Sequence, residues 1–341
     1  LPDAIRALAG AVFVDFMGVE GLSFEPDRFA DTAVYPTYEA ALAAYEATPD
    51  VDLLWDFGAG MDGVPGAPEY RSSVQLESWP PPSDVWRLFL GSDGTLVEEA
   101  PPVEDVLRYR FDPDAGSKAY ADESGADFIK PQLDVDWAPM GQGDGLSFET
   151  PVLEETAVIA GNGHLDLWFR SEGYDAGIEM ILTEVYPDGG EVLVQHGLLR
   201  AAYGDVKPIT DPLLREPLYY EENYEPLAPG EVRHLQIPIF PVAHPFRAGS
   251  KLRVTINTPG RDAPIWSYDY PDDPDWAGLG EDDPKPLTTY GGSFQEVAIG
   301  GSTPSAIVLP LVSDPAITST VVQSPPPCNS LRGQPCRDYV P

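Results

Sequence analysis

Nucleophilic catalysis is the first chemistry to look for among the serines of this 341-residue chain. A nucleophilic serine is often held in a strained G-x-S-x-G turn, and an acidic residue and a histidine complete the catalytic set. Residues 291–294 (GGSF) come closest, but Gln295 and Glu296 follow, so no glycine closes the motif. The sequence therefore predicts no catalytic residue in this chain.

The four histidines do not form a general base that the sequence can identify. A general base needs a nucleophile within hydrogen-bond reach and usually a carboxylate that orients it. No serine near these histidines in the sequence indicates such a pairing. We therefore expect structural roles for all four, His164, His196, His234 and His244.

The two cysteines, Cys328 and Cys336, lie in a proline-rich tail with seven residues between them. They do not form a C-x-x-C motif, and no histidine lies nearby to complete a zinc or redox site. We expect a small disulfide loop that fixes the tail. Because disulfides persist in oxidising compartments, we also expect the protein to be secreted.

Carboxylates and aromatic side chains gather in a long irregular segment, residues 258–292. Clustered carboxylates can bind Ca²⁺, but the spacing here matches no EF-hand loop. We therefore expect a solvated acidic loop and neither metal nor cofactor, with calcium binding or stacking of the aromatics on sugar rings as alternatives. The residues concerned are Asp272, Asp273, Asp275, Asp282 and Asp283, with Trp266, Tyr268, Tyr270, Trp276 and Tyr290.

The net charge is −36, from 56 acidic and 20 basic side chains. Such a balance argues against nucleic acid, whose phosphates need Lys and Arg, and against anionic lipid surfaces. No apolar run approaches the roughly 18 residues of a membrane-spanning helix, so we expect no membrane association. The charge is typical of a solubilising acidic shell, and the alternative is a surface that selects cationic substrates.

Two elements are expected before the β-rich part of the chain. Residues 38–47 (YEAALAAYEA) are rich in Ala, Glu and Leu and predict a helix, and residues 51–57 (VDLLWDF) predict a strand. Three prolines follow Trp79, and such a run suits a boundary because it cannot serve a central strand. Residues 1–79 and 80–321 are thus predicted to be separate units, followed by the tail 322–341.

From residue 85 onward, short apolar runs alternate with turn residues and predict a mainly β domain of the jelly-roll sandwich type. Within one run, Leu165, Leu167 and Phe169 alternate with Asp166 and Trp168, so we expect the first three to face the core. Eleven strands are predicted: 85–90, 107–111, 146–148, 152–159, 164–170, 178–186, 192–201, 231–239, 251–257, 296–300 and 305–311.

Residues 185–203 (VYPDGGEVLVQHGLLRAAY) predict a hairpin whose turn is residues 187–190 (PDGG). The stretch resembles the C-terminal β-sandwich of the cocaine-esterase and X-prolyl dipeptidyl-peptidase group of serine hydrolases, in which a D-V-x-P-D-G-x hairpin leads into a G-x-x-R strand. Further resemblances follow in the family's order: 88–96 (LFLGSDGTL), 109–113 (YRFDP), 148–152 (FETPV), 167–176 (LWFRSEGYDA), 229–237 (PGEVRHLQI), 244–253 (HPFRAGSKLR) and 307–312 (IVLPLV).

The resemblance implies that residues 1–79 are the C-terminal remainder of an α/β-hydrolase domain and that residues 80–321 form a galactose-binding-like jelly roll. The catalytic triad would lie upstream of this chain, which would be inert alone, brace the catalytic domain and line its cleft. The implied partners are that domain, in the same polypeptide or as a separate chain after cleavage, and a small ester, X-Pro peptide or amide substrate. No methionine precedes Leu1, so we expect a cleavage site or an artificial boundary there.

In the family, the segment before the F-x-T-x-P strand packs toward the catalytic cleft. Trp137 and Met140, which occupy that segment here, are therefore candidate walls of a substrate pocket, or else side chains that fill the seam between domains. The rival interpretation of the whole chain is a free-standing carbohydrate-binding β-sandwich with an exposed row of aromatics. The helix and strand within residues 1–79 argue against it, because a lone sandwich has no use for them.

Overall fold

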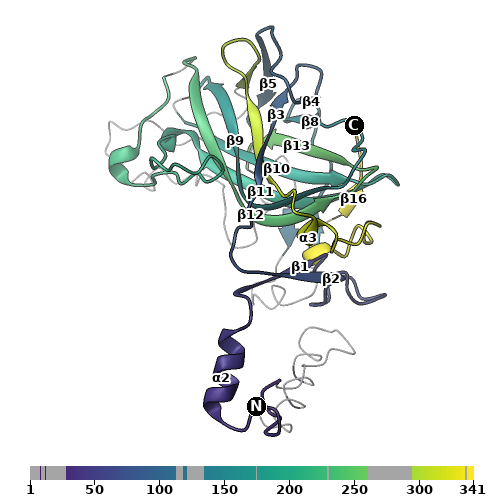
Figure 1. Ribbon diagram of the computed structural model, residues 1–341. Helices are drawn as coiled ribbons and strands as arrows, with labels where there is room; N and C mark the ends of the chain where they lie inside the picture. Colours follow the sequence, from purple (N-terminus) through teal and green to yellow (C-terminus); the bar gives the residue numbers. More distant parts are fainter. Residues whose placement is uncertain are drawn as a thin grey trace.

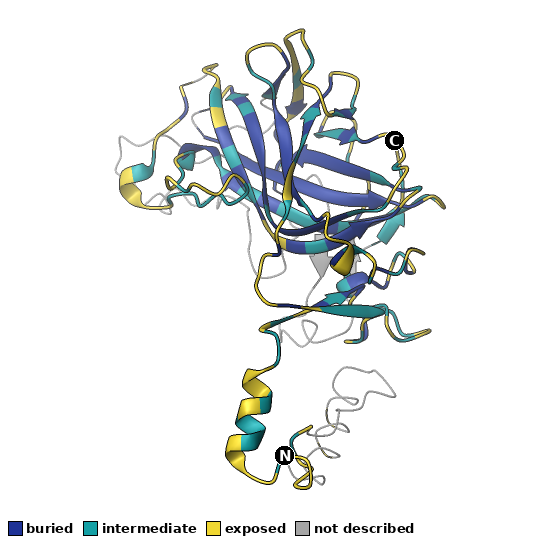
Figure 2. Cartoon of the chain, viewed as in Figure 1, coloured by how far each residue is buried: buried dark blue, intermediate teal, exposed yellow. Residues whose placement is uncertain are grey.

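The chain folds into a β body from which one helix projects (Figure 1). Helix α2 (Tyr38–Glu46) begins after Thr37, whose side-chain oxygen accepts a hydrogen bond from the backbone N–H of Ala40. None of its residues is buried, and Figure 2 shows it outside the body. The computed structural model describes residues 28–112, 137–173, 175–228, 230–259, 294–334 and 336–341, with Leu8, Val12 and the backbone of 118–120 and 134–136.

A small two-stranded sheet lies between α2 and the body. Strand β1 (Val51–Trp55) pairs antiparallel with β2 (Ser72–Leu76), which the sequence did not predict. Apolar side chains of both strands pack with Ile317 and other residues of the body, and the Trp55 indole Nε1 donates a hydrogen bond to Thr320 Oγ1 at 2.8 Å. We call the contact between this small sheet and the body the seam.

Twelve strands form the main sheet, and β6 (Lys118–Tyr120) pairs separately with β7 (Asp134–Asp136). Short helical turns lie at Ala201–Tyr203, Glu221–Asn223, Pro315–Thr318 (α3) and Leu331–Gly333. The strands of the main sheet are β3 (Asp84–Leu90), β4 (Leu96–Val97), β5 (Asp105–Arg110), β8 (Gly145–Glu149), β9 (Ala157–Ser171), β10 (Gly177–Val185), β11 (Gly190–Arg200), β12 (Arg233–Phe246), β13 (Lys251–Asn257), β14 (Phe294–Ile299), β15 (Ala306–Leu311) and β16 (Cys336–Asp338).

The main sheet curves until its ends nearly meet. Its strands follow the order β4-β3-β15-β9-β12-β11-β10-β13-β8, with β14 and β5 attached at β9 and with β16 at β11. Thr95, just before β4, forms a bridge with Glu149 at the end of β8. The mainly β prediction is confirmed, and the two layers of the sandwich belong to one continuous, almost closed sheet.

The apolar core lies inside this sheet. Leu165, Leu167 and Phe169 of β9 are fully buried in it, as their alternation predicts. The outward face of the sheet is also covered at β10, because every residue of this strand is buried, including Glu179 and Glu184. Buried carboxylates need partners, so the seam and the tail must supply charge or hydrogen bonds there.

Two strand predictions were wrong in extent. Segments 152–159 and 164–170 are not separate strands: β9 runs from Ala157 to Ser171 through two glycines. At Gly163 a side chain would come within 2.8 Å of the Val308 carbonyl oxygen, so glycine permits close approach there and does not break the strand. Similarly, β12 passes residue 239 and reaches Phe246 because a bulge between Ile239 and Val242 lets pairing resume.

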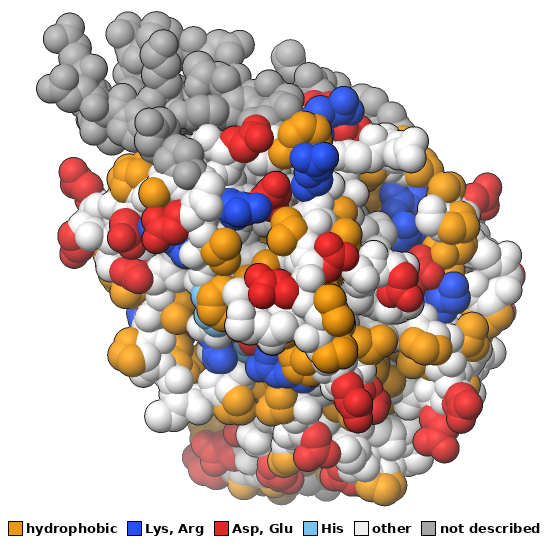
Figure 3. Space-filling model, turned by 90° about the horizontal axis from the view of Figure 1, so that it is seen from above, with side chains coloured by type: hydrophobic (Ala, Val, Ile, Leu, Met, Phe, Trp, Pro, Cys, Tyr) orange, Lys and Arg blue, Asp and Glu red, His pale blue; other side chains and the backbone are white. Residues whose placement is uncertain are grey.

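Figure 3 shows the face of the molecule seen from above. Acidic side chains are scattered over it, with a smaller number of Lys and Arg between them and no single acidic patch.

Candidate functional site

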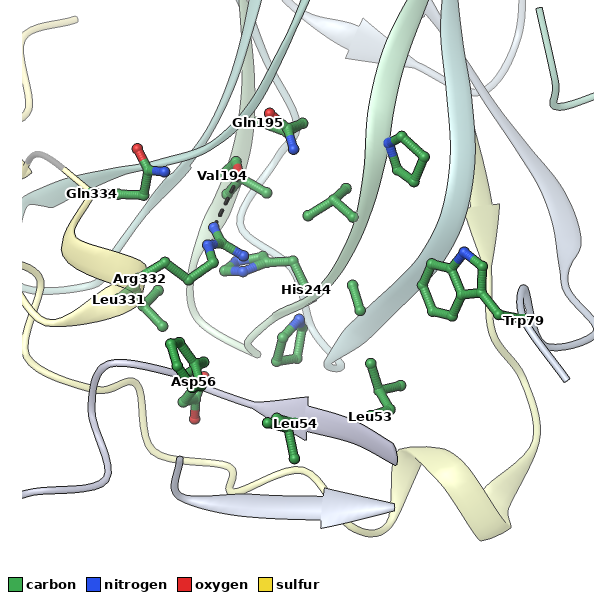
Figure 4. Close-up of a pocket in the computed structure, with 15 residues that line it drawn as sticks. Leu53, Leu54, Asp56, Trp79, Val194, Gln195, His244, Leu331, Arg332 and Gln334 are labelled. Carbon is green, nitrogen blue, oxygen red and sulfur yellow. Dashed lines mark hydrogen bonds between the residues drawn. The ribbon is translucent and has the colours of Figure 1, made fainter. Parts of the chain in front are cut away.

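A cavity of about 310 Å³ lies at the seam, and we call it the seam cavity (Figure 4). Its walls come from three parts of the chain that are distant in sequence. Residues 53–57 and Trp79 form the first wall, β11 and β12 the second, and the C-terminal tail the third, through Leu331, Arg332 and Gln334. The seam cavity therefore exists only when the small sheet, the body and the tail are assembled.

The backbone is strained where the first and third walls meet. Asp56 and Arg332 have φ angles of 52° and 49°, and among the described residues they are the two non-glycine positions with positive φ. The N–H of Arg332 donates to the Phe57 carbonyl oxygen at 2.6 Å, which ties the tail to the end of β1. Such left-handed residues cost roughly 1–3 kcal/mol each and persist where the surrounding structure holds them.

A buried ion pair joins the small sheet to the body. Arg247 Nη2 lies 2.6 Å from each oxygen of Asp56, and both side chains are fully buried. Arg71 adds a longer contact of 3.4 Å to the same carboxylate. Two buried charges are tolerated when they neutralise each other with good hydrogen-bond geometry, so this pair fixes the orientation of the small sheet on the body.

A second buried carboxylate lies beside the seam cavity. Glu184 accepts a hydrogen bond from the backbone N–H of Arg247 at 2.8 Å, and its other oxygen lies 2.8 Å from His244 Nε2. Burial lowers the pKa of His244 below its ordinary value, against the opposing effect of Glu184. The imidazole is therefore neutral at pH 7, and its Nε2–H donates to Glu184.

Arg332 is a cation of the seam cavity without a carboxylate partner among the described residues. Its Nη2 donates to the carbonyl oxygens of Leu193 at 3.4 Å and Val194 at 3.0 Å, the second of which Figure 4 marks. Burial lowers the pKa of Arg332, while Asp56 acts in the opposite direction. Carbonyl groups satisfy one nitrogen of the guanidinium but do not neutralise its charge, so this group can bind an anion.

Exposed aromatic side chains lie in and next to the walls of the seam cavity. Phe57 and Trp79 line the cavity and are 36% and 39% exposed. Phe240 precedes the lining residue Pro241 at the bulge in β12, is 50% exposed, and has its ring centroid 5.6 Å from that of His196. Aromatic side chains and arginine are enriched at the centres of protein interfaces, so this composition suits contact with another protein surface.

Trp137 and Met140, the predicted substrate-pocket residues, lie elsewhere. Trp137 is 7% exposed, and the Arg337 guanidinium lies over its ring at 4.0 Å from the centroid. Met140 is half-buried next to Gly145 of β8. Neither residue lines the seam cavity, and their role in binding substrate stays a prediction.

All four histidines have polar partners. His164 Nδ1 lies 3.2 Å from the Leu213 carbonyl oxygen, and Nε2 atoms of His164 and His234 lie 3.5 and 3.4 Å from Asp166 Oδ1. Burial raises the pKa of Asp166, but hydrogen bonds from these histidines, Gln236 and Arg87 together hold it far below its usual range. His196 Nδ1 lies 3.5 Å from Glu179 Oε1, and His244 pairs with Glu184. These contacts agree with the structural roles that we expect for the four histidines.

The predicted disulfide is present between Cys328 and Cys336. It closes the part of the tail that holds Arg332, and β16 then pairs with β11 at Val192. Arg253 Nη1 donates to the Val340 carbonyl oxygen at 2.8 Å, which fixes the end of the chain. The tail thus forms a stable third wall of the seam cavity.

The acidic segment and Ser293 lie outside the described residues, so the calcium and sugar alternatives stay untested. Within the described part of the chain, no cluster of three or more His, Cys, Asp or Glu side chains could hold a metal ion. No described helix has the length and apolar character needed to cross a membrane.

Sequence reasoning missed the charged residues of the seam. Asp56 and Arg247 are 191 residues apart, and Arg332 lies in a tail whose pattern indicated only the disulfide. The usable signal was a charged side chain within or directly after an apolar strand, as Asp56 follows 51–55 and Arg247 follows β12. Such a residue must find a partner when it is buried, but the sequence does not say which one.

Comparison with known proteins gives consistent matches. The family described as the X-Pro dipeptidyl-peptidase C-terminal non-catalytic domain matches residues 43–269. A "putative serine esterase" of Mycobacterium bovis is 23% identical over 189 residues, which are 53% of this chain and 29% of that protein.

Solved structures share the fold. An aminopeptidase from the marine sediment archaeon Thaumarchaeota archaeon matches with a TM-score of 0.56 and 20% identity, over 87% of this chain and 47% of that one. A CocE/NonD family hydrolase from Staphylococcus aureus matches with a TM-score of 0.54 and 16% identity, over 79% and 42%. The chain therefore spans less than half the length of these structures and under a third of the matched esterase.

Proposed function

The chain belongs to the X-Pro dipeptidyl-peptidase C-terminal non-catalytic domain family, and we propose that it is the C-terminal portion of a serine hydrolase that cleaves ester, X-Pro peptide or amide bonds. The catalytic serine, histidine and acid belong to a portion outside this chain. In that portion, the serine would attack the carbonyl carbon and backbone N–H groups would stabilise the oxyanion.

One observation carries this proposal: the match to a non-catalytic domain covers residues 43–269, while the regions shared with this chain make up only 29% of the matched esterase and 47% of the matched aminopeptidase. A chain that corresponds to this part of the relatives would contain the β-sandwich but not the catalytic residues. The contacts of His164, His234 and His244 with carboxylates and a carbonyl support the same conclusion.

The role that we assign to the chain is to brace the catalytic portion and to close one side of its cleft. The rigidity of the seam supports the first part, because the buried Asp56–Arg247 pair and the tail hold the small sheet in one orientation. The resemblance of the segment that holds Trp137 and Met140 to a cleft-facing segment motivates the second part. The disulfide and the high negative charge support our proposal that the protein is secreted.

The experiment compares this chain with the longer polypeptide that contains the catalytic portion. Both are assayed with p-nitrophenyl butyrate and glycyl-prolyl-p-nitroanilide and are treated with a fluorophosphonate probe that labels activated serines. We expect hydrolysis and labelling only in the longer polypeptide, with the labelled serine upstream of residue 1. Labelling of a serine within residues 1–341, or a longer polypeptide that binds polysaccharide but hydrolyses neither substrate, would overturn the proposal.

A further inference from the structure

The seam cavity presents an arginine, Arg332, that forms no ion pair with a carboxylate of the described residues. The sequence has 56 acidic side chains, yet none of those described forms an ion pair with Arg332. The neighbouring carboxylate, Asp56, is already bound by Arg247 through both oxygens. A half-buried guanidinium in an acidic protein is thus left with two carbonyl groups and an open side toward the cavity.

The opening has the composition of an interface. Phe57 and Trp79 line the cavity with Arg332 and leave more than a third of their surfaces in water, and Phe240 next to the lining residue Pro241 leaves half. Burying such aromatic surface against another protein is favourable because apolar area is removed from water. An arginine that shares a cavity with exposed aromatic side chains is the arrangement expected of an anchor point for a partner.

Helix α2 offers a surface for a partner close to the small sheet. The helix ends at Glu46, and β1, which lines the seam cavity, begins at Val51. The helix buries none of its residues and exposes Tyr38 and Tyr45. Figure 1 shows α2 leading away from β1, so a partner that packs on the end of the helix near Glu46 also lies near the small sheet that lines the cavity.

We propose that the seam cavity is the docking site for the catalytic portion of the same polypeptide, and that an Asp or Glu side chain of that portion enters the cavity and binds the Arg332 guanidinium. The inference rests on the proposed function, because it requires a catalytic portion. To the proposed function, the inference adds where the two portions make contact and which chemical groups bind each other there. A carboxylate fits because its two oxygens match the fork of guanidinium N–H donors.

The tail makes this contact possible. Arg332 lies between Cys328 and Cys336, and its backbone is hydrogen-bonded to Phe57, so the guanidinium is held in place before the partner arrives. An anchor that is already ordered loses less conformational entropy on binding. The disulfide loop thus serves to present one cation to the catalytic portion.

Photochemical cross-linking of the longer polypeptide tests the docking. Benzoylphenylalanine replaces Phe240, the exposed neighbour of the cavity-lining Pro241, in one variant. In the matched control it replaces Val103, which is 73% exposed between β4 and β5, far from α2 (Figure 1). We expect cross-links from position 240, but not from position 103, to peptides of the catalytic portion.

The failures of the two proposals can be told apart. Cross-links from position 240 that reach only residues 1–341, in a longer polypeptide that hydrolyses its substrate, would overturn the docking and leave the proposed function intact. A longer polypeptide without hydrolase activity or a labelled serine removes both proposals.

Hydrogen exchange tests the role of Arg332. We expect the amides of residues 53–57 and 242–244 to exchange at least about tenfold more slowly in the longer polypeptide than in the isolated chain. Arg332→Met should remove most of this difference and Arg332→Lys should retain part of it. The control Arg170→Met, which breaks an ion pair with Glu296 away from the cavity, should leave it unchanged.

Two results would contradict the assignment of a carboxylate partner. The first is unchanged protection in Arg332→Met. The second is a combination of two findings: sodium acetate slows exchange of the same amides in the isolated chain, and the longer polypeptide gives no cross-links. That combination would mean that the cavity binds a free carboxylate. The sequence of the cross-linked peptide identifies the candidate Asp or Glu partner. Replacing that partner with Lys, or making Arg332→Glu, should each remove the protection, and the two changes together should restore it.

Discussion

Two histidine–carboxylate clusters in this molecule contain the same residue types but have different protonation behaviour. In the seam, His244 and Glu184 are both fully buried, and burial lowers the pKa of the histidine. Around Asp166, hydrogen bonds from His164, His234, Gln236 and Arg87 together outweigh burial and hold the pKa of the carboxyl far below its usual range. The comparison shows that a single hydrogen-bonded partner does not offset full burial, whereas several partners on one group do.

The two clusters also differ in which parts of the molecule they connect. In the seam, Glu184 of β10 contacts His244 of β12 and Arg247, and Arg247 pairs with Asp56 at the end of β1. The Asp166 cluster instead joins strands β3, β9 and β12 of one sheet. We therefore expect changes in the seam to cost more stability than changes at Asp166.

The largest effect is expected from Arg247→Met. It leaves Asp56 buried without its main partner, and breaking a buried ion pair in this way typically costs about 3–5 kcal/mol. The free energy of unfolding from urea titration measures it. The double variant Asp56→Asn with Arg247→Met should recover part of the loss. A loss below about 1 kcal/mol in the single variant would show that the pair does not hold the seam together.

Removal of the disulfide should have the next largest effect. Cys328→Ser with Cys336→Ser frees the loop that holds Arg332, and closure of a loop this short stabilises by about 2–3 kcal/mol in the chain-entropy model. Limited proteolysis should cut the tail near residue 332 first, while the main sheet stays protected. Equal protection of the tail with and without the disulfide would mean that the pairing of β16 with β11 is sufficient.

A smaller effect is expected at the second cluster. Asp166→Asn weakens charge-assisted hydrogen bonds from Arg87 and two histidines, and because Arg87 is partly exposed we expect a loss of about 1–2 kcal/mol at pH 7. The lowered pKa of Asp166 gives stability that is present above its ordinary value of 3.8 and is lost in stronger acid. The difference between wild type and variant should therefore shrink below that pH.

The stability of the seam should also depend on pH, but through a histidine that resists protonation when folded, and the loss should begin nearer neutral pH. The unfolded chain binds a proton on His244 below about its ordinary pKa of 6.5, whereas the folded chain resists it. The seam therefore contributes its full stability above this pH and loses it as the pH falls. His244→Gln should flatten the curve of unfolding free energy between pH 7 and pH 5, and an unchanged slope would contradict the pKa direction.

Local features were well predicted. The helix at 38–47, the strand at 251–257 and the PDGG hairpin agree with α2, β13 and the β10–β11 turn, because residue preferences and turn geometry act over a few neighbouring residues. The ends of the strands, in contrast, depend on contacts that form only in the folded chain. The sequence analysis placed two separate strands at 152–159 and 164–170, but Gly161 and Gly163 permit close packing of one continuous β9 against Pro80 and β15, which only the folded chain reveals.

The site was largely beyond sequence reasoning. Trp137 and Met140 were singled out through resemblance, whereas the charged residues of the seam cavity, Asp56, Arg247 and Arg332, carried no motif. Their roles arise from partners that are far apart in the chain, and a list of residues does not define such pairs.

By itself, the sequence determined the mainly β character of the chain, the disulfide pair and the absence of a G-x-S-x-G motif, because these follow from residue types, periodicity and short spacings. Only the tertiary structure decided that the sheet nearly closes between Thr95 and Glu149 and that Arg247 meets Asp56. It also decided that Arg332 faces a cavity in which no carboxylate of the described residues forms an ion pair with it. The physical reason is that burial and the distance between charges, which set pairing and protonation, are properties of the folded chain.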